Sequence, residues 1–121
     1  MAGIEIELGR VLDDYSKEVR EDAERVIEQV AKETVKRLKD TSPKDTGAYA
    51  KGWRLKRDRR GMNATVYNAT HPGLTHLLEE QHPVANQYGS YGVSTPQKHI
   101  EPAEKWAIAE IDRRIEEVLD Q

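Results

Sequence analysis

The chain has 121 residues, of which 34% are charged, with a formal net charge of -3 and no cysteine. This length fits one domain spanning 1–121, and the absence of cysteine excludes disulfides and thiolate metal sites. The mixed charge gives no global attraction to nucleic acid or membrane, and no apolar run is long enough to span a bilayer. Leu, Ile and Val together number only 24 and Phe is absent, so we expect a thin core that gains stability from neighbours in an assembly.

The first third of the chain predicts one long helix. Residues 1–10 lack the basic start and apolar run of a secretory signal. Within them, residues 4–8 alternate apolar and acidic side chains, as in a short strand or the frayed start of a helix. From about Arg10 to Lys39, apolar residues recur at three- and four-residue steps, and charged residues fill the other face. Thr-Ser-Pro at 41–43 ends the pattern. The apolar stripe consists of Leu8, Val11, Leu12, Tyr15, Val19, Val26, Ile27, Val30 and Leu38.

A turn and a hairpin follow this helix. Pro43, Asp45 and Gly47 are turn-forming residues, and we expect Gly47 to adopt a positive φ. Residues 53–57 alternate as a strand does, and residues 64–68 form the returning strand after a glycine turn. The middle of the chain therefore predicts a small antiparallel unit.

The last third of the chain predicts a loop and a second long helix. Residues 74–81 fit a short helix or an irregular strand, and residues 83–99, rich in Gly, Ser, Asn, Gln and Pro, predict a mobile loop. The segment 101–121 predicts a helix with Pro102 in its first turn. Its apolar stripe consists of Ile108, Ile111, Ile115, Val118 and Leu119. Trp106 points nearly opposite to this stripe, so it needs a partner in the preceding loop, the sheet or a neighbouring subunit.

The stretch LTHLLEEQHP at 74–83 contains the best candidate for a metal or acid–base site. His76 and Glu79 or Glu80 share a face if the segment is helical, as metal ligands at such spacings do. The spacing is not that of H-E-x-x-H, however, and a proline directly follows His82. Solvated or packed histidines are therefore the favoured interpretation, and a small metal-dependent hydrolase stays an alternative.

Other catalytic motifs are incomplete or absent. Asp45-Thr46-Gly47 matches the aspartic-protease triplet, but that chemistry needs two such carboxylates in a β-rich scaffold, so a turn is favoured. The sequence has no phosphate-binding loop, no dinucleotide-binding glycine motif and no nucleophile elbow. We therefore predict no enzyme activity, no cofactor and no metal.

A basic cluster coincides with the predicted hairpin. It consists of Lys51, Arg54, Lys56, Arg57, Arg59 and Arg60, beside Tyr49 and Trp53. Such a cluster can follow a phosphate backbone, so a small nucleic-acid-binding module using residues 51–60 is a second alternative. In a hairpin, however, these side chains divide between two faces and the tip, and many charged hairpins are simply solvated sheet edges.

The order of three motifs resembles that in the tail-completion, or head–tail joining, family of long-tailed bacteriophages and prophages. A P-x-D-T-G-x-[LY]-x-x-[SG] turn follows the first helix, then an L-T-H-L-L-E-x-G-H type segment, then a P-H-I-x-P-A-E motif at the start of the last helix. The signature residues here are Pro43, Asp45, Thr46, Gly47, His76, Leu77, Leu78, Glu79, His99 and Pro102, with Tyr49, Gly52, Leu74, Thr75, His82, Ile100, Ala103 and Glu104 also matching. Gln81 departs from the usual glycine, and residues 84–94 depart from the usual basic, glycine-rich loop.

The resemblance implies both a fold and a role. The fold is α+β, with a long N-terminal and a C-terminal helix packed on a small antiparallel sheet. The role is a structural component of the virion neck, assembled in the bacterial cytoplasm as a ring of about six copies. It docks between the portal or connector and the tail-terminator or tail-tube proteins, with no membrane contact and with DNA only as passing cargo. We predict interface patches at Arg54, Arg57 and Arg59 on the hairpin and at Trp106 on the last helix.

Overall fold

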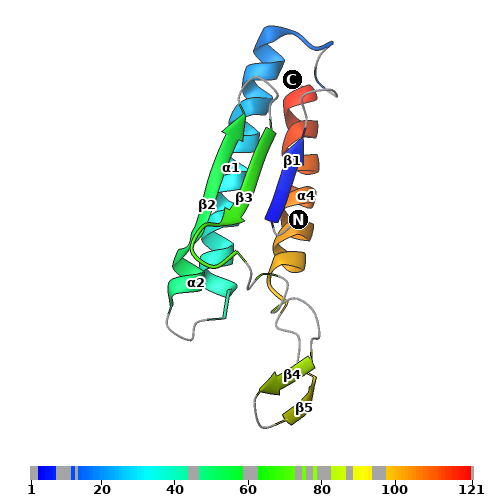
Figure 1. Ribbon diagram of the computed structural model, residues 1–121. Coiled ribbons are helices and arrows are strands. Elements are labelled where there is room, and N and C mark those ends of the chain that lie inside the picture. The colour runs from blue at the N-terminus through cyan, green and yellow to red at the C-terminus, as the bar shows by residue number, and fades with distance from the viewer. Residues whose placement is uncertain are drawn as a thin grey trace.

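The computed structural model describes residues 3–7, 12, 14–43, 47–58, 63–72, 75, 78, 83–86, 89–93 and 98–120. Two long helices lie on one face of a three-stranded antiparallel sheet, which is the α+β arrangement that the sequence predicted (Figure 1). Among these residues no helix is both long enough and apolar enough to cross a membrane. The elements are β1 (Gly3–Glu7), α1 (Lys17–Thr41), α2 (Ala48–Lys51), β2 (Trp53–Asp58), β3 (Asn63–Asn68), β4 (Pro83–Asn86), β5 (Gly89–Val93) and α4 (Ile100–Leu119).

Helix α1 begins later than the apolar spacing predicted. It starts at Lys17 rather than Arg10, because the side chain of Ser16 accepts a hydrogen bond from the backbone N–H of Val19 and caps the first turn. Before the cap, the backbone N–H of Tyr15 bonds to the carbonyl of Leu12, and Leu12 is buried in the core without being helical. A hydrogen-bonded turn therefore accounts for the three-residue spacing of Leu12 and Tyr15, which by itself indicates a helix.

The sheet has the order β1-β3-β2, with β3 in the centre. Residues 4–7 are therefore strand, which settles the two possibilities that their alternation allowed. Ile4 and Leu55 lie on either side of Val66, and Ile6 is paired with Ala64. Because side chains alternate across a strand, these residues share the face that the helices cover.

The core lies between this sheet face and the two helices. Helix α1 packs against β2, β3 and α4, and α4 also contacts β1. The buried residues of α1 are Ala23, Val26, Ile27, Val30, Ala31, Thr34 and Leu38. The hydroxyl of Thr34 donates to the carbonyl of Val30 at 2.7 Å, so this buried polar group is satisfied.

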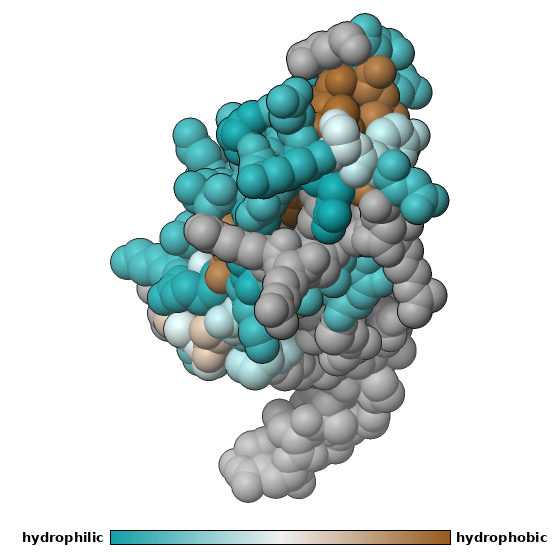
Figure 2. Space-filling model, turned by 90° about the horizontal axis from the view of Figure 1, so that it is seen from above, coloured by the Kyte–Doolittle hydropathy of each residue, from teal (hydrophilic) through white to brown (hydrophobic). Residues whose placement is uncertain are grey.

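Helix α4 buries only part of the predicted stripe: Ile111 and Val118 are buried and Ile115 packs against the core, as predicted, but Ile108 and Leu119 do not. Its buried residues are Ala103, Ala107, Ile111 and Val118, whereas Ile108 is 55% exposed and Leu119 is 39% exposed. Small alanines allow α4 to approach closely, so packing favours the alanine face over the larger isoleucine. Seen from above, hydrophobic side chains reach the surface at one side of a mostly hydrophilic end of the molecule (Figure 2).

The predicted loop at 83–99 contains a hairpin. Strands β4 and β5 pair antiparallel and form a separate two-stranded sheet, with an irregularity between Pro83 and Ala85. Figure 1 shows the hairpin extending beyond the end of the three-stranded sheet. The prediction of a loop was wrong over these nine residues, because a composition rich in Gly, Ser and Asn hides short strands.

The turn after α1 depends on Gly47. Its φ is 85° and its ψ is -12°, which confirms the predicted positive φ. Among the described residues, a Cβ on Gly47 would meet only the Lys51 side chain, at 3.9 Å. A side chain here is therefore opposed by the left-handed backbone rather than by lack of space.

We predict that Gly47→Ala lowers the free energy of unfolding by about 1 kcal/mol, because alanine strains the left-handed conformation. Gly47→Asn is the matched variant, and it should lose less, because asparagine tolerates this conformation better than alanine. Urea denaturation followed by circular dichroism measures both. Equal losses for the two variants would contradict a backbone cause.

Candidate functional site

Three buried rings meet where α2, β2 and the start of α4 come together. Tyr49 and Trp53 lie four residues apart across the short helix and the first residue of β2, and His99 directly precedes α4. The ring centroids are 5.7 Å apart for Tyr49 and Trp53, 5.4 Å for Tyr49 and His99, and 6.1 Å for Trp53 and His99. All three pairs are edge-to-face, which is a favourable geometry for aromatic rings.

Hydrogen bonds tie these rings to the end of α1. The hydroxyl of Tyr49 and Nε2 of His99 are hydrogen-bonded at 2.6 Å. The indole N–H of Trp53 donates to Oγ of Ser42 at 2.8 Å, and the Ser42 hydroxyl donates to the carbonyl of Leu38 in the last turn of α1. The end of one long helix is thereby connected to the beginning of the other.

Asn68 completes this arrangement from the end of β3. Its side-chain nitrogen donates to the carbonyl of Tyr49 at 2.7 Å, and its oxygen accepts from the backbone N–H groups of Thr70 and His71. A Cβ on Gly52 would collide with the Thr70 hydroxyl and lie 2.8 Å from the Asn68 oxygen. The chain therefore needs glycine at 52, because backbone and side chain approach too closely for anything larger.

We call Ser42, Tyr49, Trp53, Asn68 and His99 the buried node. Every member is at most 6% exposed. Buried polar side chains that are hydrogen-bonded in this way specify one arrangement of the elements that carry them. The node therefore connects the elements from which its residues come.

Two carboxyl groups with a lowered pKa lie instead on the outer surface of α4. Lys105 and Lys98, hydrogen-bonded to Glu101, lower the pKa of that carboxyl. A hydrogen bond from Arg113, helped by one from Arg114, lowers the pKa of Glu110. These groups stay ionised at neutral pH and make solvated helix-surface pairs, which contribute little to stability.

The structure brings together parts of two signature segments. Gly47 begins the turn that leads to Tyr49, and His99 contacts Tyr49 across 50 residues of sequence. Pro43 follows the end of α1, and Pro102 is an exposed residue of the first turn of α4. Leu78 packs partly buried against the core. Asp45, Thr46, Leu74, His76, Leu77, Glu79 and His82 lie outside the described residues.

The candidate metal ligands also fall in that undescribed stretch. The described residues do not include His76, Glu79, Glu80 or His82. Among the residues that are described, no group of three or more His, Asp or Glu side chains could hold a metal ion.

The basic cluster divides between the two sheet faces, as a hairpin predicts. Arg54 and Lys56 are exposed on the outer face. Arg57 points inward, is 11% exposed, and lies 3.5 Å from a Glu24 carboxylate oxygen and 3.8 Å from one of Glu28, both on α1. Arg59 lies outside the described residues. Arg57 thus joins the sheet to the helix within the subunit.

Trp106 contacts a residue of α1, whereas the sequence had suggested a partner in the preceding loop, the sheet or a neighbouring subunit. The Arg37 guanidinium of α1 lies over its ring, 4.2 Å from the centroid. Glu33, Lys36, Asp40 and Thr41 line an open hollow beside the pair. The indole is only partly buried, so one side of it stays at the surface.

Sequence reasoning missed Ser42, Trp53 and Asn68 as members of the node. One available signal was the alternation of β3, where Ala64 and Val66 face inward and Asn68 takes the next inward position. A polar residue on a buried strand face requires a hydrogen-bonding partner, and Asn68 finds several.

We predict that Tyr49→Phe lowers the free energy of unfolding by about 1–3 kcal/mol, because it removes a buried hydroxyl that is hydrogen-bonded to His99. Tyr67→Phe is the matched control, since Tyr67 is 38% exposed on the outer sheet face and should change little. Denaturant titrations measure both, and similar losses would show that the Tyr49 hydroxyl has no special role.

Comparison with known proteins agrees with the family resemblance over the part of the chain that contains the first motif and most of the second. Residues 6–80, which begin within β1 and end two residues after Leu78, match the family described as "Bacteriophage HK97-gp10, putative tail-component". Comparisons with curated proteins and with solved structures find no match. The match covers more than half of the chain and includes α1, the Gly47 turn, β2, β3 and the end of β1. The chain therefore belongs to the HK97-gp10-like family of phage tail components.

Proposed function

We propose that the protein is a non-enzymatic neck component that completes the tail by forming a ring between the portal side and the tail. Its membership of a phage tail-component family is the observation that carries this proposal. The proposed ring has about six copies, and each copy presents two different complementary patches to its neighbours. The protein would enter the virion after assembly in the bacterial cytoplasm, with the portal or connector and the tail-terminator or tail-tube proteins as partners.

The fold supports docking rather than chemistry. Both long helices cover the same sheet face, and within the described residues the opposite face has no covering element. A sheet with one open face and open edges can serve as a contact surface, whereas the polar groups of the buried node are hydrogen-bonded to one another and to the backbone. The alternative of a nucleic-acid-binding module loses support from Arg57, whose charge is directed inward to Glu24 and Glu28.

The proposed patches differ in how much of each is available at the surface. Arg54 is exposed on β2, and Trp106 offers the uncovered side of its ring. Arg57 would act indirectly, by holding β2 on α1, and Arg59 would extend the hairpin patch. Free protein should associate weakly, because small interfaces gain strength when a portal template holds several copies together.

We expect a phage that lacks this protein to produce few infectious particles, with filled heads and tails separate in electron micrographs. Trp106→Ala should leave a folded protein that restores particle formation poorly, because the interface loses its aromatic anchor. Tyr15→Ala, which truncates an aromatic residue that is 44% exposed before α1, is the matched control and should restore it fully.

Thermal melting of each purified variant separates a lost contact from a lost fold. Normal particle yields without the protein would refute the neck assignment. Normal yields with a folded Trp106→Ala variant would remove only that residue from the interface.

A further inference from the structure

We propose that neighbouring copies join edge to edge, with β2 of one copy pairing beside β1 of the next, so that the sheet continues around the ring. This inference rests on the proposed ring assembly and names the surfaces that build it. Strands β1 and β2 are the two edges of the sheet, because β3 lies between them. Among the described residues neither edge has a second strand beside it, so part of each backbone is available for pairing.

The two edges have opposite charges on the outer face. On β1 the outward residues are Glu5 and Glu7, and on β2 they include Arg54 and Lys56, all four exposed. Within the described part of the chain, no ion pair joins Glu5, Glu7 or Lys56 to an opposite charge, which leaves these three charges for a partner.

This distribution selects one of three possible pairings. Two β1 edges would bring carboxylates together, and two β2 edges would bring cations together, and like charges directly opposite each other destabilise a sheet. Only β1 with β2 brings opposite charges together. Because this contact uses two different surfaces, it is heterologous and leads to a ring or filament rather than a twofold dimer.

The strand directions and the charges also define a register. Both edges run antiparallel to β3, so they are parallel to each other, and a ring that keeps one face outward pairs them in parallel. Within one copy, pairing through β3 places Lys56 in the same row as Glu5, and Asp58 in the same row as Glu7. A joint that continued these rows without a shift would therefore place Lys56 beside Glu5 of the next copy, but Asp58 beside Glu7. A two-residue shift instead pairs Arg54 with Glu5 and Lys56 with Glu7. Closing a sheet on itself requires a stagger of this kind.

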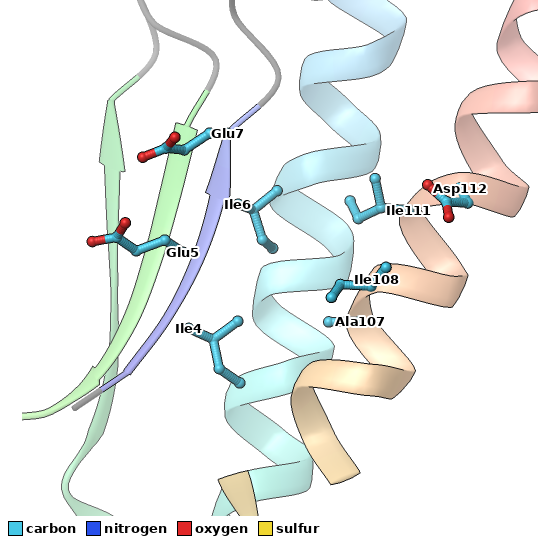
Figure 3. A pocket seen from close by; sticks show the side chains of 8 residues that line it. All are labelled: Ile4, Glu5, Ile6, Glu7, Ala107, Ile108, Ile111 and Asp112. Carbon is cyan, nitrogen blue, oxygen red and sulfur yellow. The ribbon is translucent and has the colours of Figure 1, made fainter. Parts of the chain in front are cut away.

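An apolar groove beside β1 gives the joint a hydrophobic side. It lies between β1 and α4 and has a volume of about 230 Å³. Figure 3 shows Ile4 and Ile6 on the side of β1 that faces α4, opposite Ile108 and Ile111, while Glu5 and Glu7 point away from it. Leu55, inward and only partly buried on β2, would reach this groove from the neighbouring copy. The contact would cover Ile108, which is 55% exposed in the single chain.

Charge reversal tests this joint in a phage that lacks the native protein and receives variants from a plasmid. E5K/E7K and R54E/K56E should each abolish infectious particles, because each variant has like charges at both edges. The fourfold variant, with both changes in one chain, should restore them, because its edges are complementary again. E116K/E117K reverses two neighbouring exposed carboxylates of α4, which belong to neither sheet edge, and should act like the native protein.

Engineered disulfides test the register independently, since the chain has no cysteine of its own. E5C/R54C and E7C/K56C should give a ladder of covalent oligomers in oxidised particles. E7C/R54C should give none, because the shifted register leaves these positions too far apart for a disulfide. Thermal melts of the purified variants confirm that each one is folded.

Two results would overturn the inference: a fourfold variant that is folded but inactive, or E5C/R54C protein that assembles into particles without a ladder. Either would leave the proposed neck function intact, provided that particles still require the protein. Particles that form normally without the protein would refute the neck function itself. The three outcomes are therefore distinguishable.

Discussion

The sheet has helices on one face only, and this asymmetry determines how the rest of the chain is arranged. A three-stranded sheet buries one face and needs a hydrophobic cover to be stable. Helix α1 covers β2 and β3, and α4 lies beside α1 and against β1, so a single core satisfies all three strands. The polar outer face and both edges are what remains at the surface. Contacts with other copies are proposed at these edges and at the parts of α4 that stay exposed, Ile108 among them.

The buried node explains how so small a core holds its elements in place. Trp53 and Ser42 join the beginning of β2 to the end of α1, and Tyr49 and His99 join α2 to α4. Asn68 adds the end of β3. Ser42 and His99 flank a helix, Trp53 and Asn68 are the terminal residues of their strands, and Tyr49 lies in the four-residue α2. Hydrogen bonds and edge-to-face rings thus fix the relative positions of element ends, which apolar burial alone specifies less sharply.

The sequence predicted the elements better than their faces. Periodicity found both helices and the central hairpin, and the turn chemistry at Gly47 was correct because its φ of 85° is a local property. Periodicity wrongly placed Ile108 in the core, because the apolar spacing does not show that the alanines of α4 face α1 instead. It likewise could not name Arg37 as the partner of Trp106, which depends on how two distant helices cross. Errors of this kind arise where tertiary packing chooses between acceptable local patterns.

The separation of charge between β1 and β2 is informative because the chain as a whole is nearly neutral. A net charge of -3 on 121 residues says little about partners, yet the outer face is acidic at one edge and basic at the other. Exposed sheet edges attract wrong partners, and natural proteins commonly protect them with charge. Placing opposite signs at opposite edges protects each edge against its own kind and still permits one productive contact. Short parallel pairing gives only a weak joint by itself. That weakness fits the proposed assembly, in which free copies would stay apart until a template brings them together.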